Sequence, residues 1–197
     1  MLRRAAQAVI LVAGGSMLAA CTEEAPKFNS IDITGADYAS GFKLMDHNSQ
    51  QRSLADFTGK VVVVFFGFTQ CPDVCPTTLA ELAEVRRKLG PDGERVQGLF
   101  ISLDPERDTA PVLKAYMNNF DASFLALIPT LEQLPALAKE FKIFYKKVEG
   151  ATPGSYTLDH SAADFVFDTK GKIRLYSRYG IGADALASDI AILLKSA

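Results

Sequence analysis

Two stretches of the chain are apolar without any alternation of polar residues. One spans residues 60–68 and reads Lys-Val-Val-Val-Val-Phe-Phe-Gly-Phe, and the other runs from Val96 to Leu103. Short runs rich in β-branched and aromatic residues predict strands buried on both faces, as in the middle of a parallel sheet. Further strands are predicted at residues 41–45, 143–148, 163–167 and 173–177, the last two joined as a hairpin.

The segments between these strands repeat apolar residues at helical spacing. Residues 76–89 carry Leu79, Leu82 and Val85 between charged residues, which predicts an amphipathic helix. Similar patterns predict helices at residues 109–120, 131–141 and 183–195. Alternating strands and helices followed by a hairpin and a last helix indicate an α/β layer structure. A βαβ unit followed by a ββα unit is the thioredoxin arrangement, so we expect a thioredoxin-like fold, a central mixed sheet flanked by helices, over residues 31–197.

The amino-acid composition fits a single globular domain and argues against a nucleic-acid partner, but it does not identify a function. The chain has 197 residues, of which 48% are hydrophobic, enough for one globular domain with a core. The formal net charge is −2, and no clustered basic surface is evident, so we expect no nucleic-acid partner.

The first 20 residues have the pattern of a cleaved signal peptide. Two arginines precede an apolar stretch that ends at Leu18. This stretch is too short to span a bilayer readily as a permanent transmembrane anchor. The sequence Leu-Ala-Ala-Cys ending at Cys21 resembles a bacterial lipobox, so we expect cleavage before Cys21, acylation of Cys21 and a tether at residues 21–30. The alternative is an ordinary signal peptide followed by a chance cysteine. Lipidation would place the domain on the periplasmic side of a bacterial membrane, an oxidising compartment.

Cys71 and Cys75 lie where the first buried strand meets its helix. The partial positive charge of a helix N-terminus favours thiolate over thiol, so this is a favourable place for a redox-active pair. Residues four apart share one face of a helix, so both sulfurs can point at one metal ion or, with some distortion, form a disulfide. Two thiolates are soft ligands that select Cu(I). The alternative is a purely structural disulfide, which would add little because the closed loop is so short.

Of the two histidines, His160 is the candidate third ligand. It lies in a predicted loop just before the strand at 163–167, and in a thioredoxin-like sheet that loop passes beside the helix N-terminus that bears the cysteines. Asp159 is a candidate to accept a hydrogen bond from His160 and orient it. Asp73 either tunes the thiols or interacts with the helix dipole. His47 is expected to be a surface residue.

Three motifs in order along the chain give a more specific prediction. They are Gly67-Phe68-Thr69-Gln70-Cys71-Pro72-Asp73-Val74-Cys75-Pro76, Ser102-Leu103-Asp104-Pro105-Glu106-Arg107-Asp108-Thr109 and Asp159-His160-Ser161. Together they resemble the Sco/SenC family, here in a lipoprotein. The resemblance implies a thioredoxin fold and copper, as Cu(I) or Cu(II), bound by Cys71, Cys75 and His160.

The same resemblance implies a function and partners. It implies a metallochaperone that helps to build the dinuclear copper centre of cytochrome c oxidase. The expected partners are the copper-bearing subunit of the oxidase, another periplasmic copper donor, and the membrane through the lipid anchor. Because Asp104, Arg107 and Asp108 follow a strand end, we expect them to brace the loop over the site. The alternative is that Asp108 or Thr109 simply caps the next helix.

Three other functions use the same residues. The first is a thiol-disulfide reductase that reduces the copper-site cysteines of the oxidase subunit. A general disulfide exchanger is disfavoured, because no proline occurs near Ala162 and Gln70 replaces the usual aromatic residue. A thiol peroxidase is disfavoured by the close cysteine pair and by the lack of an evident activating arginine. A zinc site would need a fourth ligand, for which only Asp159 or Asp164 is available.

Overall fold

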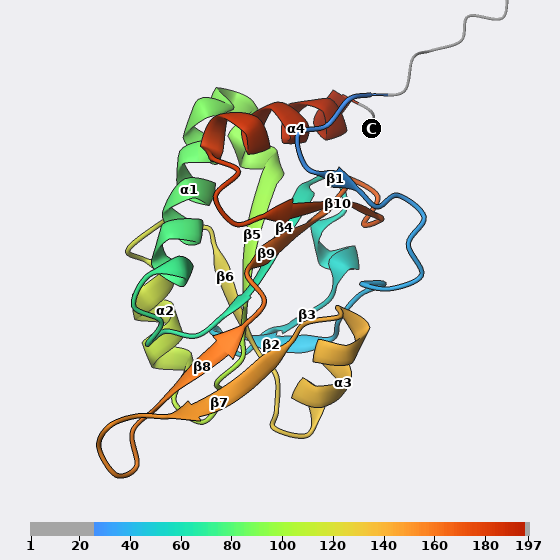
Figure 1. Ribbon diagram of the computed structural model, residues 1–197. Coiled ribbons are helices and arrows are strands. Elements are labelled where there is room, and N and C mark those ends of the chain that lie inside the picture. The colour runs from blue at the N-terminus through green and yellow to red at the C-terminus, as the bar shows by residue number, and fades with distance from the viewer. Residues whose placement is uncertain (1–25, 196–197) are drawn as a thin grey trace, which may run out of the picture.

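The computed structural model describes residues 26–195 (Figure 1). The predicted signal peptide, the lipidation site Cys21 and the first half of the tether lie outside the described residues. Within residues 26–195, no helix is both long enough and apolar enough to cross a membrane. The backbone N–H groups of Asn29 and Ser30 donate to the buried carboxylate of Asp189, so contacts with the domain begin just before Ile31.

A mixed sheet of eight strands forms the centre of the molecule, in the order β1-β10-β9-β4-β5-β6-β2-β3. Strands β4, β5 and β6 are parallel to one another, and the remaining neighbours pair antiparallel. This confirms the predicted fold class. The strands are β1 Ile31–Asp32, β2 Leu44–Asp46, β3 Gln51–Arg52, β4 Val61–Gly67, β5 Val96–Ser102, β6 Leu125–Ile128, β9 Ala163–Phe167 and β10 Ile173–Arg178.

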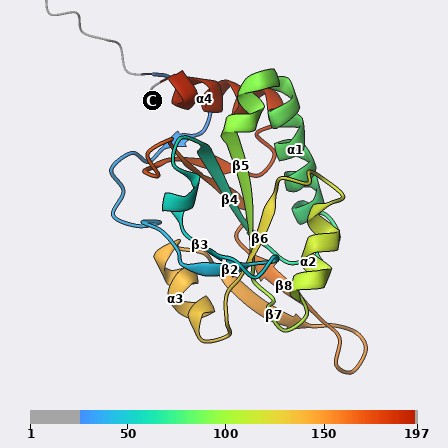
Figure 2. The same ribbon diagram turned by 180° about the vertical axis from the view of Figure 1, so that it is seen from behind.

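Helices cover both faces of the sheet (Figures 1 and 2). Side chains alternate along β4, so Phe65 and Phe66 point to opposite faces. Phe66 packs against Phe141 at the end of α3, whereas Phe100 of β5, which contacts Phe65, packs against Tyr116 of α2. The helices are α1 Val74–Lys88, α2 Ala110–Met117, α3 Gln133–Glu140 and α4 Ala183–Lys195, with 3₁₀ turns at Leu54–Phe57 and Gly90–Arg95.

Four strands were not predicted from the sequence: the two-residue strands β1 and β3, and the strands β6 and β8. Strand β6 has only four residues, too few for a periodic pattern to stand out. Strand β8, Tyr156–His160, pairs with β7, Tyr145–Glu149, in a separate two-stranded sheet. His160 is therefore the last residue of a strand and lies opposite Tyr145, where we expected a loop. The β7–β8 hairpin projects from one end of the domain (Figure 1).

Candidate metal centre

The loop between β4 and α1 brings the two cysteines together. Helix α1 begins at Val74 with Asp73 as its N-cap, so Cys71 precedes the helix and Cys75 lies in its first turn. The expectation that both cysteines share a helical face is therefore wrong. Instead the chain turns back, with Cys71 N–H donating to the Phe68 carbonyl at 3.2 Å and Cys75 N–H directed at the Cys71 sulfur at 3.4 Å.

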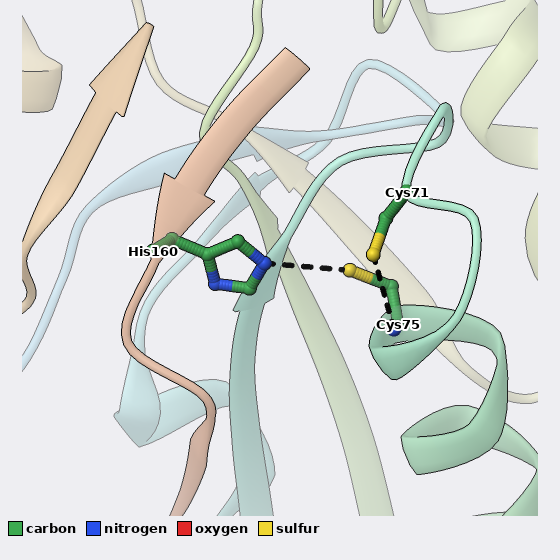
Figure 3. A group of neighbouring side chains, drawn as sticks. All are labelled: Cys71, Cys75 and His160. Atoms are coloured by element: carbon green, nitrogen blue, oxygen red, sulfur yellow. Dashed lines mark hydrogen bonds between the residues drawn. The ribbon is translucent and has the colours of Figure 1, made fainter. Parts of the chain in front are cut away.

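The predicted ligand set converges on one point (Figure 3). One ligand atom from each of Cys71, Cys75 and His160 lies within 4.8 Å of the other two. His160 Nε2 lies 3.7 Å from Cys75 Sγ. Among residues 26–195, this is the one group of three or more histidine, cysteine or carboxylate side chains with such spacing. The donor set of two sulfurs and one imidazole nitrogen fits copper.

A backbone carbonyl holds the imidazole ring of His160. His160 Nδ1 lies 2.8 Å from the carbonyl oxygen of Ser161, which can only accept, so Nδ1 carries a proton, and in the neutral imidazole Nε2 is the nitrogen with a lone pair for a metal ion. The rings of Phe65 and Phe68 meet the imidazole edge-on and restrict its rotation. The expected role of Asp159 is therefore wrong: its carboxylate is exposed, and the Ser161 carbonyl orients the ring.

The two thiols differ strongly in acidity. The Cys75 thiol beside Cys71, together with the backbone N–H groups of Asp73 and Cys75, lowers the pKa of Cys71 to about 5. The pKa of Cys75 is raised by the neighbouring Cys71 thiolate and by burial. In the metal-free protein at neutral pH the pair thus holds one proton, on buried Cys75, and Cys71 is the partly exposed thiolate.

Gly67, the last residue of β4, makes room for the buried thiol. A Cβ atom at this position would lie 2.8 Å from Cys75 Sγ and 2.8 Å from a ring carbon of Phe100. Any side chain here would push the sulfur away from its present place. The glycine is thus required by close approach, and its backbone conformation is one that other residues adopt.

Asp108 attaches the cysteine-bearing loop to strand β5. Its carboxylate is fully buried and accepts hydrogen bonds from Thr69 N–H at 3.2 Å, Thr69 Oγ1 at 2.6 Å and Ser102 Oγ at 2.7 Å. Burial raises the pKa of this carboxyl, and the hydrogen bonds partly offset that rise. This is the bracing role expected for the second motif.

Arg107 contacts the residue directly before Cys71. Its guanidinium pairs with Asp104 at 2.5 Å and donates to Gln70 Oε1 at 2.9 Å and to the Tyr156 carbonyl at 3.0 Å. It also lies over the Tyr156 ring, 3.6 Å from its centre, while the Tyr156 hydroxyl donates to Asp104 at 2.8 Å. No pattern in the sequence indicates Tyr156, because this contact joins positions 49 residues apart.

The other candidate residues lie apart from the ligand set or have other roles. Asp73 is exposed, and its side chain makes no capping hydrogen bond. His47 is half-buried, and its Nδ1 accepts the Ala126 N–H at 3.1 Å, so the expectation of a surface residue is wrong. Asp164 is buried with its Oδ1 unpartnered, and burial raises its pKa to about 8, so it is a neutral carboxyl at pH 7. A four-coordinate zinc site would need a fourth ligand beside Cys71, Cys75 and His160. Neither Asp159 nor Asp164 belongs to this group.

Comparison with known proteins agrees with this geometry. The SCO1/SenC family model matches residues 32–195. A SCO2-like protein from Rickettsia felis is 33% identical over 159 residues, covering 79% of this chain and 78% of the relative. Copper-bound ScoI from Bradyrhizobium japonicum is 34% identical, with a TM-score of 0.71 over 78% of this chain and 97% of that chain. Apo Sco1 from Thermus thermophilus is 37% identical, with a TM-score of 0.74 over 85% of this chain and 97% of that chain. The matched region contains all three ligand candidates, and the chain belongs to the SCO1/SenC family.

Proposed function

We propose that this protein is a copper chaperone that holds copper through Cys71, Cys75 and His160 and delivers it to the dinuclear copper centre of cytochrome c oxidase. The convergence of two sulfurs and one imidazole nitrogen within 4.8 Å carries the proposal. Copper-bound relatives with the same fold support the choice of metal. The oxidase subunit and a periplasmic copper donor remain the partners that the family resemblance implies.

The chemistry of the site suits a carrier that must also release its cargo. Copper binding replaces the one proton that the pair holds, so binding releases a proton and weakens as the pH falls. Cys71 is partly exposed, which gives an acceptor's ligands a route to the metal, whereas Cys75 and the face of His160 that lies between Phe65 and Phe68 are covered.

Titration of the reduced protein with Cu(II) tests the ligand set. We expect a strong sulfur-to-copper charge-transfer band that is lost in Cys71→Ala and Cys75→Ala. His160→Ala should lower copper affinity by about 10- to 100-fold or more while both cysteines remain able to oxidise. Wild-type copper retention in His160→Ala would contradict the three-ligand site, and His47→Ala is the matched control.

We further propose that Cys21 is acylated after cleavage of residues 1–20 and tethers the domain to the periplasmic face of a bacterial membrane. The Leu-Ala-Ala-Cys sequence supports this proposal. Mass spectrometry of the protein expressed in a Gram-negative host should find a diacylglyceryl group on Cys21, and Cys21→Ser should move the protein from the membrane fraction to the periplasmic fluid. Recovery of unmodified Cys21 from the membrane fraction would contradict the proposal.

The second candidate function is reduction of the copper-site cysteines of the oxidase subunit. The partly exposed, acidic thiol of Cys71 beside the protonated thiol of Cys75 favours it. The Cys71 thiolate would attack a target disulfide and displace one thiolate, and Cys75 would then give up its proton, attack Cys71 and release the target as a dithiol. The products are the reduced target and a Cys71–Cys75 disulfide, which a dithiol donor must reduce again. Turnover of a disulfide-bonded target peptide without metal tests this function, and reduction no faster than the peptide's background rate would exclude it.

A further inference from the structure

The ligands of the candidate site come from two parts of the molecule that share no hydrogen-bond ladder. His160 ends β8 in the two-stranded sheet, whereas the cysteines follow β4 of the eight-stranded sheet. Residues 161–162 lead from His160 into β9, which pairs with β4, so the backbone places the end of β8 near the cysteines. Within the described residues the rest of the hairpin, Tyr156 included, has no backbone hydrogen bond to the cysteine loop, so side-chain contacts decide how it lies against that loop. Any contact that joins the β7–β8 hairpin to the cysteine loop therefore bears directly on ligand geometry.

Arg107 makes hydrogen bonds to both parts. One guanidinium nitrogen, Nη1, donates to the side chain of Gln70, next to Cys71, and to the carbonyl of Tyr156, at the start of the strand that ends in His160. Arginine is suited to this task because its planar group presents several donors in a fixed arrangement, which lysine does not.

A buried carboxylate and an aromatic ring hold the Arg107 guanidinium in place. The Asp104 carboxylate, which pairs with the Arg107 Nε, has a side chain only 3% exposed. The guanidinium stacks on the Tyr156 ring, and the Tyr156 hydroxyl closes the network by donating to Asp104. Because the Asp104 carboxylate is buried, its ion pair with Arg107 is less screened than a pair in solvent, whereas the hydrogen bond to Gln70 lies at the exposed edge of the cluster.

We propose that Arg107 is a positioning residue: by binding Gln70 and Tyr156 together it holds the His160-bearing hairpin against the cysteine loop and slows the loss of copper. The inference rests on the proposed function and goes beyond it, because neither Arg107 nor Gln70 is a ligand. It also gives a role to Gln70, the residue that replaces the aromatic side chain usual in thiol oxidoreductases.

Gln70→Ala is the sharpest test, because Gln70 is exposed and its removal leaves the Arg107–Asp104 pair intact. The rate at which Cu(I) leaves the protein is measured with an excess of a chromophoric Cu(I) chelator. We expect this rate to rise about tenfold in Gln70→Ala and in Arg107→Lys, the size of effect seen when partners of metal ligands are removed. Lys146→Gln is the matched control: Lys146 lies at an exposed position of β7 in the same hairpin and, within the described residues, has no ion pair with residues 104–108, whereas Lys147 pairs with Glu106.

Two further measurements separate positioning from a general loss of stability. In a His160→Ala background, Gln70→Ala should not change the rate further, because the ligand whose placement it supports is gone. In the copper-free protein, amide hydrogen exchange in residues 145–160 should be faster in Arg107→Lys than in wild type, with unchanged exchange in β4 and β5.

Several outcomes would overturn the inference. They are an unchanged rate in both Gln70→Ala and Arg107→Lys, an equal rise in Lys146→Gln, or a full additional rise in the His160→Ala background. Failure of the proposed function would look different. The chelator would then take copper from the wild-type protein as fast as it binds free Cu(I).

Discussion

At the scale of single residues, the asymmetry between the two thiols is the property with the clearest chemical consequence. Cys71 is partly exposed and acidic, and Cys75 is buried and protonated. An ordinary cysteine titrates near pH 8.5, so at neutral pH most free thiols react slowly. Cys71 should therefore be the sulfur that attacks a disulfide. Cys75 should be the sulfur that resolves the resulting mixed disulfide or that completes the copper site.

Alkylation of the reduced, metal-free protein measures this asymmetry. The rate of reaction of iodoacetamide with Cys71 should rise with pH through a midpoint near 5, because the lowered pKa makes the thiolate available above that value. Cys75 should remain unmodified up to at least pH 9, since its pKa is raised. Peptide mapping by mass spectrometry identifies the modified residue. A midpoint for Cys71 near 8.5 would show that its neighbours do not stabilise the thiolate.

The linked effect on stability has the corresponding sign. The Cys71 thiol is deprotonated in the folded state and protonated in the unfolded state between about pH 5 and the unfolded value near 8.5. Across that window the unfolded state binds more protons, so this group contributes stability that rises with pH and is lost as the pH falls through about 5.

Gly67→Ala tests the close packing around Cys75. The added methyl would lie 2.8 Å from Cys75 Sγ, so the sulfur must move and copper affinity should fall. Overpacking of this kind costs about 1–3 kcal/mol of unfolding free energy. Gly98→Ala is the matched control, because its methyl would press on Phe124 and Leu82 in the core of β5 and leave the thiol in place. Equal copper affinity in both variants would contradict the role of Gly67.

At the scale of elements, the loop between β4 and α1 is held by a neighbouring strand and its loop. Asp108 reaches this loop from the segment after β5, and Arg107 reaches it from the same segment. Because β4 and β5 are parallel, their carboxyl ends meet at the same edge of the sheet, and the segments that follow them can contact each other. The second sequence motif is thus a structural support for the first.

Asp108→Asn should loosen this support. The amide can accept fewer hydrogen bonds than the carboxylate, and Thr69 or Ser102 then loses a buried acceptor. We expect a loss of about 1–3 kcal/mol in unfolding free energy, measured by urea denaturation of the copper-free protein. Asp121→Asn provides a comparison, because its carboxylate lies at a partly exposed site and pairs with Arg86. A smaller loss in Asp108→Asn than in Asp121→Asn would contradict the bracing role.

At the scale of the whole molecule, the buried carboxyl of Asp164 links stability to pH. Asp164 on β9 has an unpartnered Oδ1, and its cross-strand neighbour Ser177 has an unpartnered hydroxyl. Burial, assisted by the charge of Glu81, raises the pKa of Asp164 to about 8. Between about pH 4 and pH 8 the folded state therefore keeps a proton that the unfolded state loses, so this residue makes the protein less stable as the pH rises.

Asp164→Asn removes this pH dependence. At pH 7 the variant should be more stable than wild type by about 4 kcal/mol, and the difference should nearly vanish below about pH 4, where both states of wild type become protonated. Thermal or urea unfolding at several pH values measures the difference. Asp92→Asn, at an exposed position, is the control and should show no such trend. A gain that is the same at pH 4 and pH 7 would show that titration of Asp164 is not its cause.

The sequence by itself determined the fold class, most helices and strands, and the three ligand candidates. The unbroken apolar runs of β4 and β5 and the helical spacing in α1 are local patterns. Such patterns can be recognised from the sequence without the tertiary structure. Cys71, Cys75 and His160 stood out because few residue types bind soft metals and because their motifs are specific.

Only the tertiary structure decided how those residues are held. The pairing of β7 with β8, the Ser161 carbonyl in place of Asp159 as the partner of His160, and the contact of Arg107 with both Gln70 and Tyr156 all depend on where separate segments meet. Whether Cys71 lies in the helix or before it depends on a turn of a few residues, for which the sequence pattern permits both. Hydrogen-bond partners are chosen by distances in space, and those distances are set by the packing of the whole chain.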